Sequence, residues 1–304
     1  MCLQNVIDEL IDICGSDSVL QNVSLKDYTS MKVGGNADVV IEPDSIVKIK
    51  DCICALRKGN VPYMIMGNGS NLIFSDEGFR GVIIEVSSRF SKIEVNGEYM
   101  VAEAGALLSR AANLALANSL TGLEFASGIP GTIGGAAYMN AGAYGGEMSS
   151  VIVETLNLDR DGNFIILKGE EHNFSYRNSR IQQDGLICLK VTMKLQKGNP
   201  EEIRATMNDL NARRQEKQPL DMPSAGSVFK RPEGHFAGKL IQDCGLRGFS
   251  IGGAQVSEKH CGFIVNTGTA TAKDVVDLID YIQKTVYEKT GILLEPEVRI
   301  IGRS

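Results

Sequence analysis

The chain has 304 residues, of which 43% are hydrophobic and 22% are charged, a composition typical of soluble globular proteins. Its 31 basic and 37 acidic residues give a formal net charge of −6, which argues against nucleic acid or an anionic membrane as the main partner. No apolar run approaches the roughly 20 residues that a membrane-spanning helix needs. We therefore expect a cytoplasmic protein whose partners are small molecules. A monomer is a separate expectation, which composition and charge do not decide.

The N-terminal part of the chain predicts a β-α-β unit that ends in a glycine-containing loop. The first helix is acidic and amphipathic and carries no signal-peptide pattern. The loop, GNGSNLIFSD at residues 67–76, is suited to a phosphate group. The expected elements are a helix in 1–15, a strand at 38–41, a helix capped by Asp44 or Ser45 and ended by Gly59, and a strand at 61–66.

The familiar nucleotide signatures do not fit this loop or any other. Gly67 and Gly69 continue to Leu72, where a dinucleotide fingerprint would have glycine, and the following residues predict a strand instead of a helix. The nearest match to a phosphate-binding P-loop, residues 234–239, is one residue too short and is followed by Leu240 instead of Ser or Thr. The sequence thus excludes both motifs.

The middle of the chain predicts short strands around a glycine-rich stretch. Residues 122–146 contain eight glycines, with Glu124 as the only ionisable side chain. Glycine lets the backbone approach a ligand closely, so we expect backbone amides of this stretch to face a ligand; the alternative is a packed turn and a small-residue helix. The other expected elements are strands within 81–104, a helix at 106–118 with Leu107 on its apolar face, a hairpin of strands 151–158 and 164–167, and a strand at 187–195.

A change of composition at residues 197–200 marks the best domain boundary, because a charge-rich helix follows it. The last hundred residues contain a further amphipathic helix that ends at Gly291. The expected elements here are helices at 201–215, 237–244 and 271–290 and strands at 263–265 and 292–301.

Cysteine and histidine give no sign of a disulfide framework or a metal site. The seven cysteines include no C-x-x-C pair, so we expect free thiols in a reducing compartment. None of the three histidines has metal-ligand spacing, so no metal is expected. The cysteines are Cys2, Cys14, Cys52, Cys54, Cys188, Cys244 and Cys261, and the histidines are His172, His235 and His260.

Three polar segments stand out from the apolar pattern and together offer a cation, a hydroxyl group and a carboxylate. They are SYRNSR with Arg177, AGSVFKRP with Ser227, and EPEVR with Glu297. Such a set can hold an anion and deliver a proton. The structural alternatives are a surface ion pair for Arg177, a turn or helix N-cap for Ser227, and a solvated charge for Glu297.

Five motifs, in this order and spacing, resemble the UDP-N-acetylenolpyruvoylglucosamine reductase family. They are GNGSN, GIPGTIGGAAYMNAGAYGGE, SYRNSR, AGSVFKRP and EPEVR, and the resemblance spans about Thr29 to Gly302. The compact third region and the continuation Lys230-Arg231-Pro232 resemble the shorter class of that family. In the longer class, an asparagine that helps to bind the substrate stands at the position of Arg231.

The resemblance implies an α+β fold: a two-lobed FAD-binding module of the vanillyl-alcohol-oxidase (PCMH) type, followed by an α+β substrate-binding domain. We expect the lobes at residues 1–86 and 87–199 and the substrate-binding domain at 200–304, with the strand 292–301 returning toward the flavin. FAD would be noncovalent, because His172 is the first histidine and lies beyond both flavin loops. The implied cofactor-binding residues are Gly67, Asn68, Gly69, Ser70, Asn71, Leu72, Gly128, Ile129, Pro130, Gly131, Thr132, Gly134, Gly135 and Ala136.

The activity implied by the resemblance is the NADPH-dependent reduction of an enolpyruvyl sugar nucleotide to UDP-N-acetylmuramate for peptidoglycan. Arg177 with Glu297 would stabilise an enolate-like intermediate, and Ser227 would donate the proton. Two alternatives stay open: another FAD-dependent oxidoreductase of the same fold that acts on a sugar or alcohol, and a catalytically inactive nucleotide-binding module. The candidates for binding the substrate are Tyr176, Arg213, Arg214, Lys217, Lys230 and Arg231.

Overall fold

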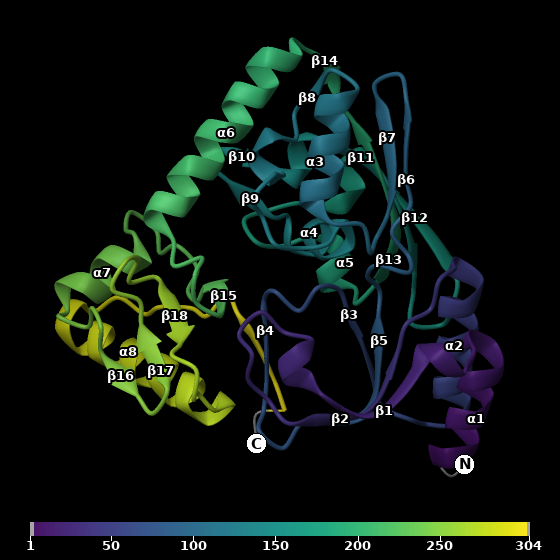
Figure 1. Cartoon of the computed structure of the whole chain (residues 1–304), viewed down its shortest axis with the longest axis horizontal. Coiled ribbons are helices and arrows are strands. Elements are labelled where there is room, and N and C mark those ends of the chain that lie inside the picture. The colour runs from purple at the N-terminus through teal and green to yellow at the C-terminus, as the bar shows by residue number, and fades with distance from the viewer. Residues whose placement is uncertain (1–2, 303–304) are drawn as a thin grey trace. The chain divides into compact units, whose positions relative to one another are not determined.

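The computed structural model describes residues 3–302 and divides the chain into two compact units (Figure 1). Unit 1 comprises Met1–Gln21, Val39–Asn68 and Gly81–Arg213. Unit 2 comprises Asn22–Asp38, Gly69–Arg80 and Arg214–Ser304. Neither unit is one continuous stretch of chain.

The boundaries of these units differ from the domain ranges expected from the sequence. Unit 1 holds most of the expected lobes 1–86 and 87–199, whose separation into two lobes stays a prediction. Two segments of the first expected lobe belong to unit 2 instead, because Met31, Val33 and Ile73 are fully buried in the apolar core of that unit. These two segments, Asn22–Asp38 and Gly69–Arg80, thus share their apolar core with the C-terminal part of the chain.

The helices expected in residues 1–15, between Ser45 and Gly59, and in 106–118 and 201–215 form in unit 1, whereas the short helix 180–183 was not predicted. Ser45 caps the second helix, its hydroxyl accepting a hydrogen bond of 3.3 Å from the backbone N–H of Lys48, while Asp44 forms an ion pair with the Lys48 side chain. Leu107 lies outside the third helix as its N-cap and is 42% exposed, so its expected place on the apolar face is wrong. The helices are α1 (Leu3–Cys14), α2 (Ile46–Lys58), α3 (Leu108–Ala117), α4 (Ile133–Met139), α5 (Arg180–Gln183) and α6 (Pro200–Lys217), which ends in unit 2.

Two sheets form most of the β-structure associated with unit 1. The first has the order β1-β2-β5-β3, with β3 and β5 parallel. The second has the order β12-β11-β13-β7-β6 and is antiparallel throughout, which confirms the expected hairpin at 151–167. Their strands are β1 (Val19–Ser24), β2 (Asn36–Ile41), β3 (Tyr63–Met66), β5 (Phe79–Glu85), β6 (Ile93–Asn96), β7 (Tyr99–Glu103), β11 (Ile152–Leu158), β12 (Phe164–Lys168) and β13 (Ile187–Lys194).

The glycine-rich stretch 122–146 folds into short elements around α4. It contains the 3-10 helix η3 (Glu124–Ala126) and ends in β9 (Gly142–Ala143), which pairs with β10 (Gly146–Glu147). The strand β8 (Leu120–Thr121), which pairs with β14 (Gln196–Lys197), precedes it, and the 3-10 helix η4 (Met148–Ser150) follows it. The remaining 3-10 helices are η1 (Ser16–Ser18), η2 (Leu25–Asp27) and η5 (Gly169–His172).

Unit 2 is built around an antiparallel sheet with the order β15-β18-β17-β16. Apolar residues of this sheet and of helices α7 and α8 share one core. Thr271 and Asp274 form a capping box at the start of α8, and Gly291 ends it in the left-handed conformation at φ 74°, as the sequence predicts. The elements are β15 (Ser224–Ser227), β16 (Ser250–Ile251), β17 (Ala254–Val256), β18 (Phe263–Asn266), α7 (Ala237–Asp243) and α8 (Ala272–Thr290).

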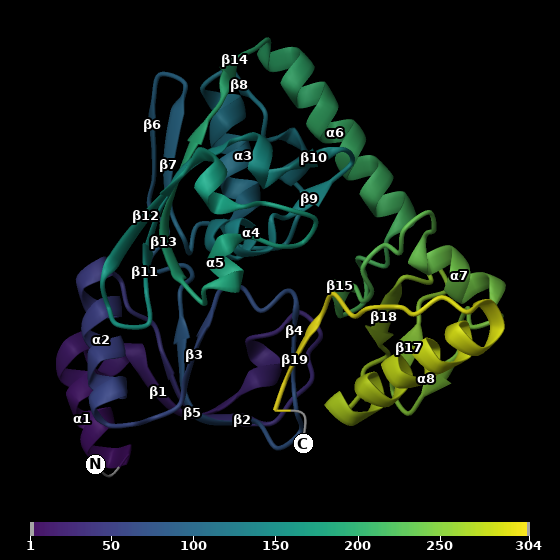
Figure 2. The same ribbon diagram turned by 180° about the vertical axis from the view of Figure 1, so that it is seen from behind.

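The last strand, β19 (Arg299–Ile301), pairs in parallel with β4 (Leu72–Phe74), as Figure 2 shows. It is shorter than the expected strand 292–301. Residues 292–298 form no regular β-strand, since Pro296 has no N–H to donate and makes only an isolated bridge with Phe229. Its predicted return toward a flavin stays a prediction.

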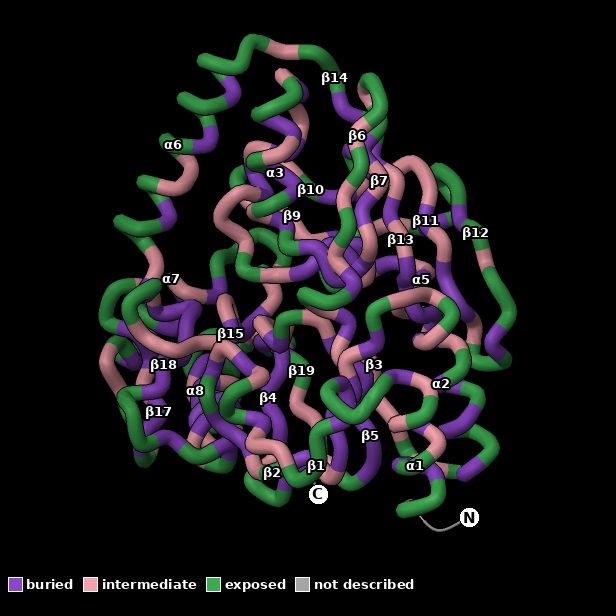
Figure 3. The backbone as a smooth tube through the Cα atoms, turned by 45° about the vertical axis from the view of Figure 1, so that its right-hand side comes forward, coloured by how far each residue is buried: buried purple, intermediate pink, exposed green. Residues whose placement is uncertain are grey.

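Burial in the charge-rich helix α6 is confined to a few positions (Figure 3). In α6 the buried Ile203 and Met207 lie one helical turn apart, and most of its other positions are exposed.

Cys14 of α1 and Cys52 of α2 are buried with their sulfur atoms 3.3 Å apart. The six described cysteines are free thiols, and Cys2 lies outside the described residues. Among residues 3–302, no helix is both long and apolar enough to cross a membrane.

Candidate active site

The first glycine loop, residues 67–71, begins in unit 1 against the segment that precedes α4. The side-chain amide of Asn68 donates a hydrogen bond of 3.3 Å to the carbonyl oxygen of Pro130. A Cβ atom added to Gly67 would lie only 2.4 Å from the hydroxyl oxygen of Thr132, which caps α4 by accepting from Gly135 N–H. Glycine at position 67 therefore lets the two predicted flavin loops pack closely.

The loop continues into unit 2, where its backbone has the left-handed conformation. Gly69 has φ 60°, and a Cβ atom there would lie 1.9 Å from the carbonyl oxygen of Tyr28. Within the part of the chain that the structure describes, the backbone N–H groups of residues 67–71 donate no hydrogen bond to the protein. A run of such N–H groups is the chemistry that a pyrophosphate needs, so this loop fits the predicted cofactor.

The second glycine loop is different. The backbone N–H groups of Ile129, Gly131, Ile133 and Gly134 all donate to carbonyl oxygens of the protein, the last two to Ala106 and Ala104 in bonds of 2.7 and 2.8 Å. The expectation that backbone amides face a ligand is therefore wrong for these four residues. The alternative that the sequence left open, a packed turn and a small-residue helix, describes them better.

Arg177 lies at the tip of a tight turn in unit 1. Ser175 and Asn178 exchange two backbone hydrogen bonds of 3.1 Å and so close the turn. Arg177 itself has φ 56°, an unusual conformation for a residue other than glycine or asparagine. Its guanidinium donates a bond of 3.2 Å to the carbonyl oxygen of Gly142 and lies over the ring of Tyr176, 5.0 Å from the ring centre.

Buried polar groups hold this turn in place. The amide of Asn140, which is 1% exposed, donates to the carbonyl oxygen of Ser175 at 3.1 Å and accepts from the backbone N–H of Ser149 at 2.9 Å. The hydroxyl of Ser179 caps α5 and donates to the carbonyl oxygen of Tyr138 at 2.8 Å. The anchoring role of Asn140 was not predicted, although asparagine at the C-terminal end of a helix is a signal for the left-handed conformation that it adopts at φ 43°.

Ser227 and Glu297 are brought side by side in unit 2 by a ladder of backbone hydrogen bonds. Glu297 N–H donates to Val228 O at 2.7 Å, and Lys230 N–H donates to Glu295 O at 2.8 Å. Both Ser227 and Glu297 are half-buried. The Ser227 hydroxyl donates to Phe229 O at 3.3 Å and does not cap a helix, and Glu297 is not a fully solvated charge.

The end of the first glycine loop joins this ladder. The Asn71 side-chain amide donates to the carbonyl oxygen of Glu297 at 3.2 Å, and the backbone N–H of Arg299 donates to Asn71 O at 3.0 Å. The parallel pairing of β4 and β19 continues from this point. The predicted cofactor residue Asn71 thus contacts the segment that carries Glu297, a link that the sequence did not predict.

Comparison with known proteins agrees with this arrangement. Residues 218–301 match the family "UDP-N-acetylenolpyruvoylglucosamine reductase, C-terminal domain", and residues 37–168 match the family "FAD binding domain". The UDP-N-acetylenolpyruvoylglucosamine reductase of Caldanaerobacter subterraneus subsp. tengcongensis is 52% identical over 297 residues, which are 98% of each chain. The chain belongs to the UDP-N-acetylenolpyruvoylglucosamine reductase family.

Solved structures confirm the predicted fold of this family member. The crystal structure of UDP-N-acetylenolpyruvylglucosamine reductase from Thermus caldophilus has a TM-score of 0.80 and 36% identity, and the match covers 93% of this chain and 98% of that one. Phl p 4.0202, a glucose dehydrogenase, has a TM-score of 0.51 and 15% identity over 64% of this chain and 44% of its own. The second likeness concerns the fold alone. The match to an FAD binding domain confirms the predicted cofactor.

The candidates for substrate binding in this reductase-family chain have varied surroundings. Arg213 forms an exposed ion pair of 2.8 Å with Asp209, and Lys230 pairs with Glu295. The Arg231 guanidinium lies 4.0 Å from the centre of the Phe236 ring. The remaining candidates also differ in exposure, as Lys217 and Tyr176 are exposed whereas Arg214 is 8% exposed.

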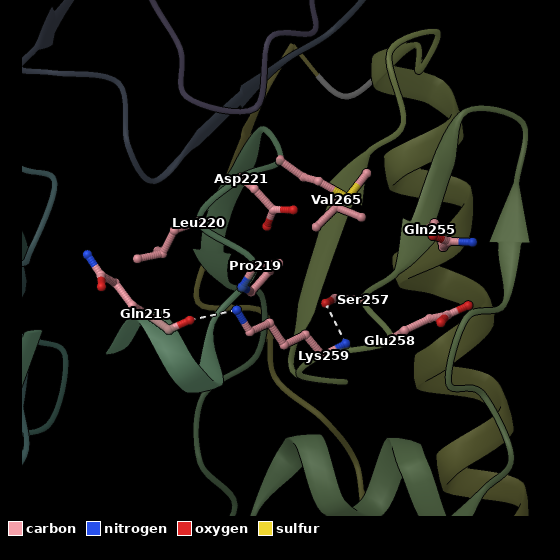
Figure 4. A pocket seen from close by; sticks show the side chains of 10 residues that line it. Gln215, Pro219, Leu220, Asp221, Gln255, Ser257, Glu258, Lys259 and Val265 are labelled. Carbon is pink, nitrogen blue, oxygen red and sulfur yellow. Dashed lines mark hydrogen bonds between the residues drawn. The ribbon is translucent and has the colours of Figure 1, made fainter. Parts of the chain in front are cut away.

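A pocket of about 460 Å³ lies in unit 2 (Figure 4). Within it, Lys259 Nζ donates to the backbone carbonyl oxygen of Gln215 at 2.6 Å. None of the six substrate-binding candidates lines this pocket. Its lining residues are Gln215, Pro219, Leu220, Asp221, Met222, Gln255, Ser257, Glu258, Lys259 and Val265. Among residues 3–302, no group of three or more His, Cys, Asp or Glu side chains is arranged to hold a metal ion.

Proposed function

We propose that this protein uses FAD and NADPH to reduce the enolpyruvyl group of UDP-N-acetylglucosamine enolpyruvate to UDP-N-acetylmuramate, a peptidoglycan precursor. The observation that carries the proposal is the 52% identity to a named reductase over 98% of both chains. The ladder that joins the Ser227 and Glu297 segments supports it, because the reaction needs a proton donor beside a group that holds an anion.

The residues of the first glycine loop are the proposed holders of the cofactor. When bound, FAD supplies a group that accepts a hydride from NADPH and gives it to the substrate. Residues 67–71 would receive its pyrophosphate on their backbone N–H groups. The packed second loop, residues 128–136, would contribute shape more than hydrogen bonds, because six of its N–H groups already have protein partners.

Arg177 is proposed to hold the carboxylate of the substrate while negative charge develops beside it. Hydride addition to the terminal carbon of an enolpyruvyl ether leaves charge on the carbon that bears the carboxylate. A guanidinium binds such a group through two parallel hydrogen bonds, which a lysine cannot reproduce. We assign Glu297 to the same task, in which its carboxylic acid form would donate a second hydrogen bond to the enolate-like group.

Ser227 is proposed to donate the proton that completes the reduction. A serine hydroxyl is a weak acid, so it can act only on a strongly basic carbon and only from a fixed position. An enediolate-like carbanion meets the first condition. The ladder supports the second, since Val228, the neighbour of Ser227, accepts from Glu297 N–H and donates to Gly262 O at 2.9 Å.

The sugar-nucleotide end is proposed to contact Tyr176, Arg213, Lys217, Lys230 and Arg231. The ion pairs of Arg213 and Lys230 would have to open or be shared for these side chains to reach a diphosphate. We further propose that the enzyme is cytoplasmic and that it is a monomer. Light scattering on the purified protein would test the monomeric state.

The proposed reaction can be tested as two half-reactions under anaerobic conditions. NADPH should bleach the flavin absorbance of the purified protein, and the enolpyruvyl sugar nucleotide should then restore it with formation of UDP-N-acetylmuramate. UDP-N-acetylglucosamine, which lacks the enolpyruvyl group, is the matched control and should leave the flavin reduced. Failure of the enolpyruvyl substrate to restore the absorbance would contradict the proposal.

The noncovalent state of FAD has a separate test. Denaturation should release the flavin into the supernatant, because no histidine precedes residue 172. Flavin that stays with the precipitated chain would show a covalent link instead.

A further inference from the structure

His260 lies in the hairpin loop between β17 and β18, close to Ser227, and no role has been assigned to it so far. Ser257 organises this loop, its hydroxyl accepting from the backbone N–H groups of Lys259 and His260 at 3.2 and 3.3 Å. The imidazole Nδ1 of His260 then accepts a hydrogen bond of 3.1 Å from the backbone N–H of Gly262. The ring therefore holds Gly262, the residue that precedes β18 and pairs with Val228 next to β15.

Gly262 connects the imidazole to the proposed proton donor. Its carbonyl oxygen accepts from the backbone N–H of Val228 at 2.9 Å, so it holds the residue that follows Ser227. A Cβ atom on Gly262 would lie 2.9 Å from Cε1 of His260 and 3.5 Å from the hydroxyl oxygen of Ser227. The ring and the hydroxyl thus both lie close to Gly262, where an added side chain would crowd the ring.

The hydrogen bond to Gly262 requires an unprotonated Nδ1. A neutral imidazole with its proton on Nε2 has one acceptor nitrogen, whereas an imidazolium has none. Protonation would set two N–H groups against each other at 3.1 Å and push Gly262 away from the ring. Because Gly262 holds Val228, the displacement would be passed to Ser227.

We propose that neutral His260 is a positioning residue that holds Ser227, through Gly262 and Val228, in the place from which its hydroxyl donates the proton. This inference rests on the proposed function. If it is correct, the protonation step requires an unprotonated imidazole at His260, whereas the step that uses NADPH does not.

The surroundings of His260 favour its neutral form. Burial lowers the pKa of His260 below its ordinary value of 6.5, and the nearby Arg247 charge acts in the same direction. Burial also raises the pKa of its neighbour Cys261, which is therefore an uncharged thiol at neutral pH. From α7, which packs Gly238 against the ring, the charged groups are Lys239 and Asp243, and they form an exposed ion pair with each other.

The test follows both half-reactions from about pH 5 to pH 8 by stopped-flow spectroscopy. In the wild type, reoxidation of the flavin by the enolpyruvyl substrate should slow as the pH falls through the lowered pKa of His260. His260→Asn should lose this acidic limb, because the asparagine oxygen offers an acceptor near the position of Nδ1 and does not titrate. His260→Leu, which offers no acceptor, should slow reoxidation about 10–100-fold at every pH, the usual cost of a misplacement of about 1 Å.

Three comparisons decide the outcome. The reduction by NADPH should stay near the wild-type rate in both variants, and the exposed histidine variant His235→Asn should keep the acidic limb. An unchanged acidic limb in His260→Asn, or wild-type reoxidation in His260→Leu, would overturn the proposal. If His260→Leu does not fold, the pH profile of His260→Asn decides alone. Wild-type protein that is never reoxidised by the substrate would instead contradict the proposed function.

Discussion

The turn that carries Arg177 and the ladder that joins Ser227 to Glu297 hold their functional side chains in opposite ways. The turn is local: Ser175 and Asn178 close it by themselves, and Asn140 anchors it. The ladder joins segments that are far apart in the sequence, and it exists only after unit 2 has folded. A change in the turn should therefore act on one side chain, whereas a change in the ladder should act on both of its segments.

The difference also concerns what each region can tolerate. Arg177 occupies a strained left-handed conformation, which its closed turn and its bond to Gly142 maintain. Ser227 follows Gly226, which supplies the left-handed conformation at φ 79° instead. In the ladder, glycine thus takes the left-handed conformation, and the functional residue Ser227 does not.

The largest effect is expected for Ser227→Ala, which removes the proposed proton donor and leaves the ladder intact. Reoxidation of the flavin by the enolpyruvyl substrate should slow about 10²–10⁴-fold, as is usual for loss of a general acid, while reduction by NADPH stays near normal. Ser224→Ala, on the same strand β15, is the matched control and should leave both half-reactions unchanged. Equal slowing of the two half-reactions would indicate a distorted pocket.

A smaller effect is expected for Arg177→Lys, which keeps the charge but loses the planar fork. Turnover should fall about 10–100-fold, in line with the loss of a charged hydrogen bond. The control is Arg180→Lys, because Arg180 belongs to the same motif and forms an exposed ion pair of 2.9 Å with Asp184. Wild-type turnover of Arg177→Lys would assign this arginine to the surface.

The anchoring of the turn can be tested with two asparagines that share one backbone conformation. Asn140 has φ 43° and is buried with two hydrogen bonds, whereas Asn173 has φ 45° and is exposed. Asn140→Ala should lower the free energy of unfolding about 1–3 kcal/mol more than Asn173→Ala, because it leaves buried groups unpaired. If chemical denaturation shows equal losses of unfolding free energy for the two variants, the buried hydrogen bonds of Asn140 do not stabilise the turn.

The smallest effect is expected from His172, a fully buried histidine of unit 1. Burial lowers the pKa of His172, so the unfolded chain binds more protons than the folded one at mildly acid pH. Its contribution to stability should therefore be complete above its ordinary pKa of 6.5 and decrease as the pH falls. Thermal melting of His172→Gln should depend less on pH than melting of the wild type, whereas the exposed His235→Gln should match it. A wild-type pH dependence in His172→Gln would contradict this.

Local structure could be predicted from the sequence because the responsible residues are close together. Ser45 and Gly291 mark helix ends through contacts within four residues, and the structure confirms both, whereas Thr271, expected as the first helical residue, is the N-cap. Leu107 was misplaced because an apolar residue at the start of a helical pattern does not reveal whether the helix or the preceding turn includes it. Residues 292–298 were misplaced because their partners, Val228 and Lys230, are distant in the sequence.

The candidate site shows the same limit. The motifs with Arg177, Ser227 and Glu297 could be singled out by residue type, but their use depended on resemblance to a family. No local pattern in the sequence indicates that Asn71 contacts Glu297, or that His260 and Ser227 both lie close to Gly262. The roles of the three residues stay predictions until the variants are measured.

The interleaved make-up of unit 2 affects how the protein is made. Strand β4 leaves the ribosome about 225 residues before its partner β19, an interval of roughly 10–45 s at a translation rate of about 5–20 residues per second. Throughout that time Met31, Val33 and Ile73 have no completed core to enter. The nascent chain therefore presents apolar segments that chaperones can bind, and its folding cannot finish before translation ends.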